Sequence, residues 1–389
     1  MSKTFLQPSY IELDEEALAD NFKYLRRIAA GPVKISSVIK GNAYGHGIST
    51  YLPMAERCGI NHFSVFSASE AVIALESSQN PETDLMIMGM IREDELEWAI
   101  ENEIEFYLFE TKRLDAAISC SKKTGKKAKV HLEIETGMNR TGFEEEQWDQ
   151  IFTKIKAHSS ELKLMGICTH YAGAESVANF YRIQNQNYNF KKAVKKARSV
   201  FGNIPVVHSC SSAAFLTLPD MHYDMVRIGI AQFGFWPSRE TYMDQMKRNL
   251  FDRGADPLKR VMTWKSEVMS TKWVDEGEFI GYGNFYMTGR RMRIATVPIG
   301  YSHGFGRDLT NSGYVLIHGE RAGVVGLVNM NMITVDITNI TDAQKGDTVV
   351  LIGKQGSDEI TVASFGEMTN NLNYEVLTRL PSSIPREAR

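Results

Sequence analysis

Lys40 lies in a segment whose composition suits a reactive amine. The segment VIKGNAYGHG (38–47) places this lysine between an apolar run and a stretch with three glycines, a tyrosine and a histidine. A lysine amine can attack a carbonyl group and form a Schiff base, which is one way in which enzymes use lysine as a nucleophile. A single lysine at the end of a strand is more often a solvated charge. The chemistry of Lys40 therefore depends on the residues that the fold brings near it.

Eight short apolar runs, separated by amphipathic stretches, are expected to be strands. They lie at 33–40, 62–67, 84–89, 104–109, 129–135, 164–172, 206–211 and 225–230. Helical patterns lie between most of them, as in 67–78 and 186–201. Eight such units predict an α/β barrel, a (β/α)8 TIM-type barrel over residues 10–250. A doubly wound sheet is the alternative, but eight strands in about 200 residues suit closure into a barrel better.

The pattern changes from about residue 260 onward. RMRIATVPIGY (291–301), GYVLIHGERAGVVG (313–326) and DTVVLIG (347–353) are rich in β-branched residues, with turn residues between them and little helical periodicity. We predict a C-terminal, mostly β domain over residues 251–389, which residues 1–9 could join.

Polar and loop-forming residues lie at or just after the carboxyl ends of several expected strands. They are Lys40, Arg140, His170, Ser212, Arg227, Gly229 and Ile230. In a TIM-type barrel these strand ends meet on one rim, and the loops after the last two strands usually bind phosphate. Each residue alone could have an ordinary structural role, so their shared position carries the prediction. A lysine beside a phosphate site suits a Schiff base with pyridoxal phosphate, although spacing alone predicts only a barrel enzyme with a phosphate-bearing ligand.

The composition excludes several other classes of function. A formal net charge of −3 gives no electrostatic reason to expect nucleic acid, and KKAVKKAR (191–198) has the pattern of the solvated face of a helix. No apolar run reaches the length of about 18 residues that a membrane span needs. The four cysteines lie far apart and predict neither a disulfide framework nor a zinc site. We expect a cytoplasmic protein without nucleic-acid, membrane or metal partners.

KGNAYGHG resembles the signature of the alanine racemase family. The resemblance continues through ETGMNRTG, THYAG, HSCSSAA, MVRIGIAQFG, GYGNFY and VPIGYSHG. It implies a (β/α)8 barrel with a C-terminal β domain, pyridoxal 5′-phosphate as cofactor, and racemisation of a small amino acid, with alanine as the first expectation. It also implies a homodimer with shared active sites.

The resemblance assigns most of the rim residues to the cofactor. Lys40 would carry it, and Tyr44, Ser212, Gly229 and Ile230 would hold its phosphate. These assignments rest on matching positions in KGNAYGHG, HSCSSAA and MVRIGIAQFG.

The remaining assignments concern the ring of the cofactor and the substrate. Arg227 would face the pyridine nitrogen, and Arg140 would bind the substrate carboxylate. His170 would lie between Arg227 and Tyr286 of the second subunit. Tyr301 and the backbone N–H of Met330 would complete the substrate site.

Racemisation requires one base on each face of the α-carbon, and Lys40 and Tyr286 would be this pair. A free tyrosine has a pKa of about 10, so it needs cationic neighbours to act as a base at neutral pH. An arginine, with a pKa above about 12, does not protonate the pyridine nitrogen. This favours racemisation over transamination, and over decarboxylases of the same fold that carry glutamate at that position.

Four residues depart from the family pattern. Glu133 replaces a carbamylated lysine, Asn331 replaces an aspartate, His303 stands where aspartate is common, and Ser382 stands where some members have a large aromatic residue. A substrate pocket with a smaller and less charged wall would admit amino acids with side chains longer than a methyl group. A serine or broad-specificity racemase is therefore the alternative. A fold-related decarboxylase and a non-catalytic cofactor-binding protein remain the alternatives from other classes.

Overall fold

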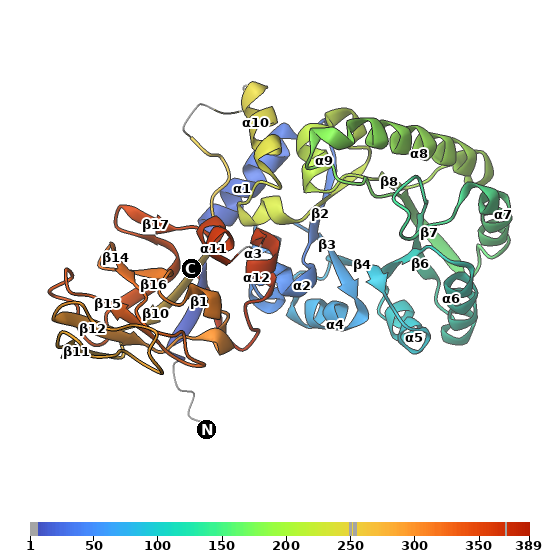
Figure 1. Cartoon of the computed structure of the whole chain (residues 1–389). Coiled ribbons are helices and arrows are strands. Elements are labelled where there is room, and N and C mark those ends of the chain that lie inside the picture. The colour runs from blue at the N-terminus through green and yellow to red at the C-terminus, as the bar shows by residue number, and fades with distance from the viewer. Residues whose placement is uncertain (1–6, 249–250, 252–254, 370–371) are drawn as a thin grey trace. The chain divides into compact units, whose positions relative to one another are not determined.

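The computed structural model describes residues 7–248, 251, 255–369 and 372–389 (Figure 1). The chain divides into two compact units. The barrel unit comprises Glu16–Lys40 and Leu52–Lys259, and the β unit comprises Met1–Glu15, Gly41–Tyr51 and Arg260–Arg389.

Eight parallel strands form a closed barrel in chain order from β2 to β9. They are β2 (Lys34–Val38), β3 (His62–Ser67), β4 (Asp84–Met90), β5 (Glu105–Leu108), β6 (Ala128–Glu133), β7 (Leu162–Cys168), β8 (Val206–His208) and β9 (Met225–Ile228). The first and last strands pair in parallel, with Ser36 opposite Arg227. The predicted (β/α)8 barrel is therefore confirmed.

Six of these strands end earlier than their apolar patterns predict, and three of them bear on the rim. β2 ends at Val38 rather than at Lys40, β7 at Cys168 rather than at 172, and β8 at His208 rather than at 211. The apolar character of the chain continues beyond the last ladder hydrogen bond, because the first residues of these loops are also buried. Lys40, His170 and Ser212 consequently lie just beyond the strands rather than on them.

Helices alternate with the barrel strands (Figure 1). They are α1 (Glu15–Ile28), α3 (Ile48–Arg57), α4 (Ala68–Ser77), α5 (Glu93–Glu101), α6 (Thr111–Thr124), α7 (Trp148–Ala157), α8 (Phe180–Phe201), α9 (Ser212–Thr217) and α10 (Arg239–Lys247). Among the described residues, no helix has both the length and the hydropathy that crossing a bilayer requires.

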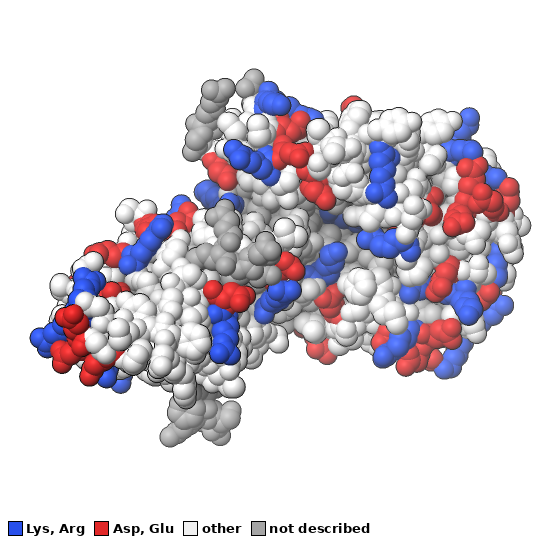
Figure 2. Space-filling model, in the orientation of Figure 1, with Lys and Arg blue, Asp and Glu red and all other residues white. Residues whose placement is uncertain are grey.

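Helix α8 shows why these segments are helical. Its buried residues Ile183, Phe190, Ala193 and Ala197 recur at helical spacing. Lysines lie on the other face, where Lys196 pairs with Asp149 of α7. The prediction of a solvated basic face is confirmed, and on the face drawn in Figure 2 lysines and arginines are interspersed with acidic residues.

The β unit contains two sheets. One joins β14 (Glu320–Gly323), β13 (Tyr314–Ile317), β16 (Thr348–Gln355), β10 (Met262–Glu267), β1 (Ser9–Leu13) and β18 (Arg386–Ala388) in this order, with β17 (Asp358–Ile360) paired to β16. The other joins β11 (Ser270–Val274), β12 (Met292–Val297) and β15 (Ile333–Asp336). Two short helices follow, α11 (Val362–Thr369) and α12 (Asn373–Thr378). A mostly β C-terminal region is therefore confirmed.

The N-terminal residues 1–9 bear on the predicted domain boundaries. Residues 1–6 lie outside the described residues. Ser9 begins β1, which pairs antiparallel with β10 and parallel with β18. Ser9 Oγ also accepts a hydrogen bond of 2.9 Å from the indole N–H of buried Trp264.

Asn21 joins three segments of the barrel unit through its amide. It is fully buried on α1, and its Nδ2 donates to the carbonyl oxygens of Gln232, at 3.1 Å, and of Lys259, at 2.8 Å. Its Oδ1 accepts from the backbone N–H of Lys259 at 2.7 Å. The amide thus satisfies three backbone groups that no regular ladder pairs.

We predict that Asn21→Leu lowers the free energy of unfolding by about 3 kcal/mol, because it leaves these backbone groups without partners. The neighbouring variant Asp20→Asn breaks only an exposed ion pair to Lys259 and should cost no more than about 1 kcal/mol. Urea denaturation followed by tryptophan fluorescence measures both. Equal losses in the free energy of unfolding for the two variants would contradict the role assigned to the Asn21 amide.

Candidate active site

One turn of left-handed helix follows Lys40 along the chain. Gly41, Asn42, Ala43 and Tyr44 have φ of 62°, 53°, 53° and 51°. Each residue with a Cβ loses about 1–2 kcal/mol in this conformation. Such strain persists only where surrounding contacts impose it, and it is typical of functional segments. The glycines of KGNAYGHG thus belong to an unusual turn rather than to a flexible loop.

Hydrogen bonds within the loop hold this turn. The N–H of Gly45 donates to the carbonyl oxygen of Gly41 at 3.0 Å, and the N–H of Gly47 donates to that of Asn42 at 2.9 Å. The side chain of Asn42 accepts from the N–H of Ile48 at 3.0 Å. Burial lowers the pKa of His46 to about 3, so its neutral ring can donate from Nδ1 to the carbonyl oxygens of Ala43 and Tyr44.

The C-terminal segment of the β unit also holds the loop. Arg386 donates from Nε and Nη2 to the carbonyl oxygen of Gly45, at 3.1 and 2.9 Å, and from Nη1 to that of Pro381 at 2.6 Å. A Cβ built at Gly45, where φ is 81°, would lie 2.0 Å from the carbonyl oxygen of Leu377. Tyr44 is buried, with its ring centroid 6.0 Å from that of Tyr374.

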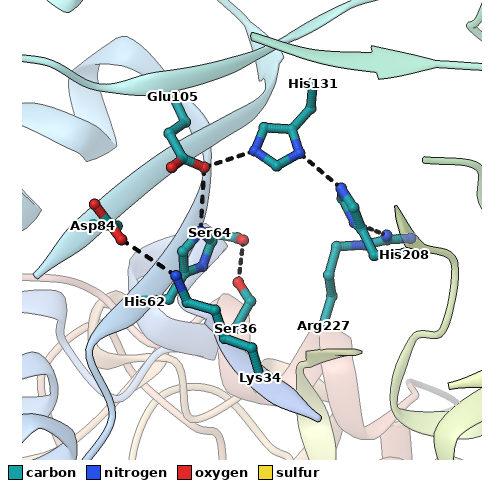
Figure 3. A network of polar contacts seen from close by, with 9 residues as sticks. All are labelled: Lys34, Ser36, His62, Ser64, Asp84, Glu105, His131, His208 and Arg227. Atoms are coloured by element: carbon teal, nitrogen blue, oxygen red, sulfur yellow. Dashed lines mark hydrogen bonds and ion pairs between the residues drawn. The ribbon is translucent and has the colours of Figure 1, made fainter. Parts of the chain in front are cut away.

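Arg227 lies buried near the end of β9 and is bound on several sides. Figure 3 shows its contact with His208. Its Nη2 donates to the carbonyl oxygens of Thr169 and Ser209, both at 2.9 Å, and lies 3.4 Å from Nδ1 of His170. Its Nη1 lies 2.5 Å from Nδ1 of His208. Among the described residues, no acceptor binds its Nε–H, which leaves that group for an acceptor that a ligand supplies.

His170 lies among three cationic side chains of the barrel unit. Burial lowers its pKa to about 3, and the charges of Arg227, Arg140 and Lys40 act in the same direction. The imidazole is therefore neutral at physiological pH. Since a guanidinium can only donate, Nδ1 of His170 accepts from Arg227 and the proton lies on Nε2.

The pKa of the Lys40 amine is lowered from its usual value. Although Lys40 keeps contact with solvent, the protein atoms around its ammonium lower its pKa, and Arg140 lowers that pKa further. A neutral amine is the nucleophilic form. The structure thus brings Lys40, Arg140, His170 and Arg227 within electrostatic reach of one another, as expected for one rim.

Ser212 and the segment after β9 form a small group of polar backbone contacts. Oγ of Ser212 accepts from the N–H of Gly229 at 2.8 Å and lies 3.5 Å from that of Ala231. Ser212 and Ile230 are both buried. The O–H of Ser212 can donate to a phosphate oxygen while Oγ accepts from the backbone, so Ser212, Gly229 and Ile230 also lie together as expected.

The loop that carries Arg140 is held by side chains that the sequence pattern does not single out. Glu135 accepts from the backbone N–H groups of Gly137, of Asn139 at 2.9 Å and of Arg140 at 3.3 Å. Gln186 of α8 donates to the carbonyl oxygen of His170 at 2.9 Å and lies 3.4 Å from Oγ1 of Thr136. One amide thus joins the loops that carry Arg140 and His170.

Glu133 is buried at the end of β6, where the family pattern has a carbamylated lysine. Burial raises the pKa of its carboxyl group, while a hydrogen bond from Thr141 and the charge of Arg140 act in the opposite direction. The described residues contain no ion pair between Glu133 and Arg140. Whether Glu133 positions Arg140 therefore stays a prediction.

The β unit brings the expected substrate residues together. The N–H of Tyr301 donates to the carbonyl oxygen of Asn329 at 3.0 Å, and Oγ of Ser302 donates to that of Met330 at 2.7 Å. Asn331 in turn donates from Nδ2 to Oγ of Ser302 at 3.0 Å. Within the described part of the chain no acceptor binds the N–H of Met330, which could bind a carboxylate.

Tyr286 is the last residue of GYGNFY (281–286), in the β unit. It is half-buried and packs against a cluster that includes Val274, Ile280 and Met292. This contact agrees with an ordinary structural role as well, so a role in a second subunit stays a prediction.

His208 and Gln186 are the residues that the sequence analysis missed. His208 lies within an apolar strand, and Gln186 lies in an amide-rich helical segment, QNQNYNF. A polar residue at a buried position of a strand or helix is the signal that could have drawn attention to both.

Comparison with known proteins identifies the family. The model of the alanine racemase N-terminal domain matches residues 13–237, and that of the alanine racemase C-terminal domain matches residues 261–388. The chain belongs to the alanine racemase family.

Similar proteins extend over almost the whole chain. The alanine racemase of Leptospira interrogans is 33% identical over 97% of this chain and 95% of its own length. That of Halothermothrix orenii is 32% identical over 100% and 98%. Among solved structures, alanine racemase from Clostridium difficile 630 has a TM-score of 0.89 and 30% identity, covering 99% of this chain and 97% of its own. Alanine racemase from Bacillus anthracis, with bound L-Ala-P, has a TM-score of 0.87 and 28% identity, covering 100% and 96%.

The left-handed turn of this family member generates a prediction. Gly45→Ala should lower the free energy of unfolding by at least about 3 kcal/mol, because left-handed strain adds to a clash with a backbone oxygen. Gly31 is a matched control, since its φ is 89° and a Cβ there would meet nothing within 4 Å. Gly31→Ala should therefore cost only about 1–2 kcal/mol. Chemical denaturation compares the two, and losses of the same size would show that the clash is relieved without cost.

Proposed function

We propose that this protein interconverts the L and D enantiomers of alanine with pyridoxal 5′-phosphate as its cofactor. The observation that carries the proposal is the buried Arg227, whose Nε–H keeps no protein acceptor among the described residues while Lys40 and Arg140 lie within electrostatic reach of the same histidine. The alanine racemases that the chain resembles, one of them solved with L-Ala-P, support alanine as the substrate.

The residues of the barrel unit fit this cofactor. The lowered pKa of Lys40 makes its amine available to bind the aldehyde carbon. The hydroxyl of Ser212, which lies against the backbone of Gly229, suits the phosphate, and Gly229, Ile230 and Tyr44 are further contacts that we expect for it. The unpartnered Nε–H of Arg227 suits the pyridine nitrogen. When bound, pyridoxal phosphate withdraws electrons from the α-carbon of the attached amino acid and makes its hydrogen acidic.

The chain's own residues would position the substrate and move the protons. Arg140 and the N–H of Met330 would bind the carboxylate, with Tyr301 beside them. Lys40 would take or deliver a proton on one face of the α-carbon, and Tyr286 would do so on the other. Arg227 keeps its protons and therefore leaves the pyridine nitrogen unprotonated, which favours return of a proton to the α-carbon.

A homodimer follows from the role of Tyr286. We propose that Tyr286 acts in the barrel of a second subunit, so that each active site contains residues of both chains. The tautomer of His170 supports this role, because its Nε2–H is available to donate to a phenolate oxygen.

Serine is the second candidate substrate. Ser382 is exposed, and Asn331 carries no charge, where the family pattern has a large aromatic residue and an aspartate. Discrimination by pocket size amounts to only about 1–3 kcal/mol per methylene group, so activity on more than one amino acid is consistent with the same site.

Exchange of the α-hydrogen in D₂O tests the proposed function. Purified holoenzyme is incubated with L-alanine or L-serine, and deuterium incorporation and chirality are measured together. We expect exchange with inversion, fastest for alanine, and none with the variant Lys40→Ala. Faster reaction of serine would favour the second candidate, and absence of exchange with both would refute racemisation.

The two-base assignment predicts an asymmetric loss of exchange in Tyr286→Phe. Removal of the α-hydrogen from L-alanine should slow by about 10²–10⁴-fold, because that face has lost its base. Exchange with retention in D-alanine should persist, since Lys40 still serves its own face. Initial rates of deuterium wash-in for each enantiomer measure this difference, and an equal loss for both would contradict the role of Tyr286.

A further inference from the structure

A chain of buried polar side chains crosses the barrel interior from Arg227 to the first residue of β5 (Figure 3). Nη1 of Arg227 lies 2.5 Å from Nδ1 of His208, and Nε2 of His208 lies 2.9 Å from Nδ1 of His131. Nε2 of His131 then lies 2.7 Å from Oε2 of Glu105. All four side chains are at most 5% exposed, so water does not replace these contacts.

The donor and acceptor capacity of each group allows one arrangement of protons in this chain. A guanidinium has only N–H donors, so Nδ1 of His208 must accept and its proton must lie on Nε2. Nδ1 of His131 must then accept in turn, and the proton of His131 must lie on Nε2. That N–H points to Glu105, which accepts as a carboxylate. Every N–H in the chain therefore points away from Arg227 and toward Glu105.

The surroundings of the chain agree with this arrangement. Burial alone would raise the pKa of the Glu105 carboxyl group, but hydrogen bonds from His131 and His62 outweigh it and hold that pKa below its usual range. Burial and the charge of Arg227 hold the pKa of His208 well below its usual range, so its ring is neutral. A Cβ at Gly166 would lie 2.6 Å from Nδ1 of His131, so a glycine in β7 makes room for the ring.

Neither metal binding nor simple charge attraction accounts for these four side chains. Among the described residues, no group of three His, Cys, Asp or Glu side chains could hold a metal ion. Direct attraction between the charges of Glu105 and Arg227 is weak, since two imidazole rings separate them. Each hydrogen bond in the row instead fixes which ring nitrogen of the next histidine carries the proton.

We propose that Glu105 is a positioning residue for Arg227. By accepting from His131, Glu105 favours the same tautomer of both histidines that Arg227 requires, so that His208 presents a lone pair to Arg227. The guanidinium is thereby held with its Nε–H free for the pyridine nitrogen. This inference rests on the proposed function only where it gives the Nε–H of Arg227 to the pyridine nitrogen. The tautomers of His131 and His208 follow from the hydrogen bonds of the protein itself.

The tautomers are tested directly by ¹⁵N NMR of the holoenzyme labelled at histidine. The wild-type protein should show His131 and His208 as neutral rings with the proton on Nε2, assigned through the variants His131→Gln and His208→Asn. A doubly protonated His131, or a proton on its Nδ1, would overturn the proposal. This readout does not depend on racemase activity, so it separates failure of this proposal from failure of the proposed function.

Variants of Glu105 test the consequence for Arg227. Glu105→Leu removes the acceptor of the Nε2–H of His131 and should give mixed tautomers for His131, whose Nδ1–H form cannot accept from His208. Only Arg227 then favours the wild-type tautomer of His208, and we expect kcat lower by about tenfold and KM for alanine within about twofold. Glu105→Gln keeps an oxygen acceptor of the same reach and should retain the wild-type tautomer and a kcat within about threefold. Equal kcat losses for Gln and Leu, or an unchanged tautomer in Glu105→Leu, would overturn the proposal.

His62→Phe is the matched control. His62 is also buried and lies 3.4 Å from Oε2 of Glu105, but it is not part of the path to Arg227. Its replacement should leave the tautomers and kcat within about twofold of wild type, whatever it costs in stability. A loss of kcat as large as that of Glu105→Leu would show that any disruption near Glu105 lowers kcat, and it would overturn the specific role of Glu105. If Glu105→Leu does not fold, the tautomers of the wild-type protein and of Glu105→Gln still test whether Glu105 positions Arg227.

Discussion

The buried guanidinium of Arg227 can only donate hydrogen bonds, and the interior of the barrel unit is arranged around that constraint. Acceptors must surround it, and they come from Thr169, Ser209 and His208, on two neighbouring strands or just beyond them. The same constraint sets the protons of His170 on one side and of His208 on the other. One residue type thus determines hydrogen-bond directions toward both the rim and the opposite end of the barrel.

The electrostatic character of the rim follows from the same group. Arg227, Arg140 and Lys40 form no ion pair among the described residues, and Glu133, the acid that opposes them, has its pKa raised by burial. A rim with three cationic side chains that form no ion pair among the described residues favours anionic ligands such as a carboxylate and a phosphate. It also keeps His170 neutral, so that this residue can act only through hydrogen bonds.

Sequence patterns were sufficient for the barrel and for the residues on its rim, because alternating apolar runs and their carboxyl ends identify both. They could not give the strand ends, since Ile39 and Thr169 remain buried after the ladders stop. They also could not pair His131 with His208, which lie 77 residues apart and meet only when the barrel closes. The function of Glu105 was equally hidden, because an acid at the start of a strand is usually solvated.

The left-handed turn after Lys40 has a consequence for the order in which the protein matures during synthesis. It is held in part by Arg386, and Gly45 at its end lies close to the carbonyl oxygen of Leu377. Both residues are made more than 300 residues after Gly45. A turn that is unfavourable by itself cannot persist before those residues leave the ribosome. The segment beside Lys40 is therefore completed by residues made more than 300 residues later, and a product truncated before them would keep Lys40 without the backbone that follows it in place.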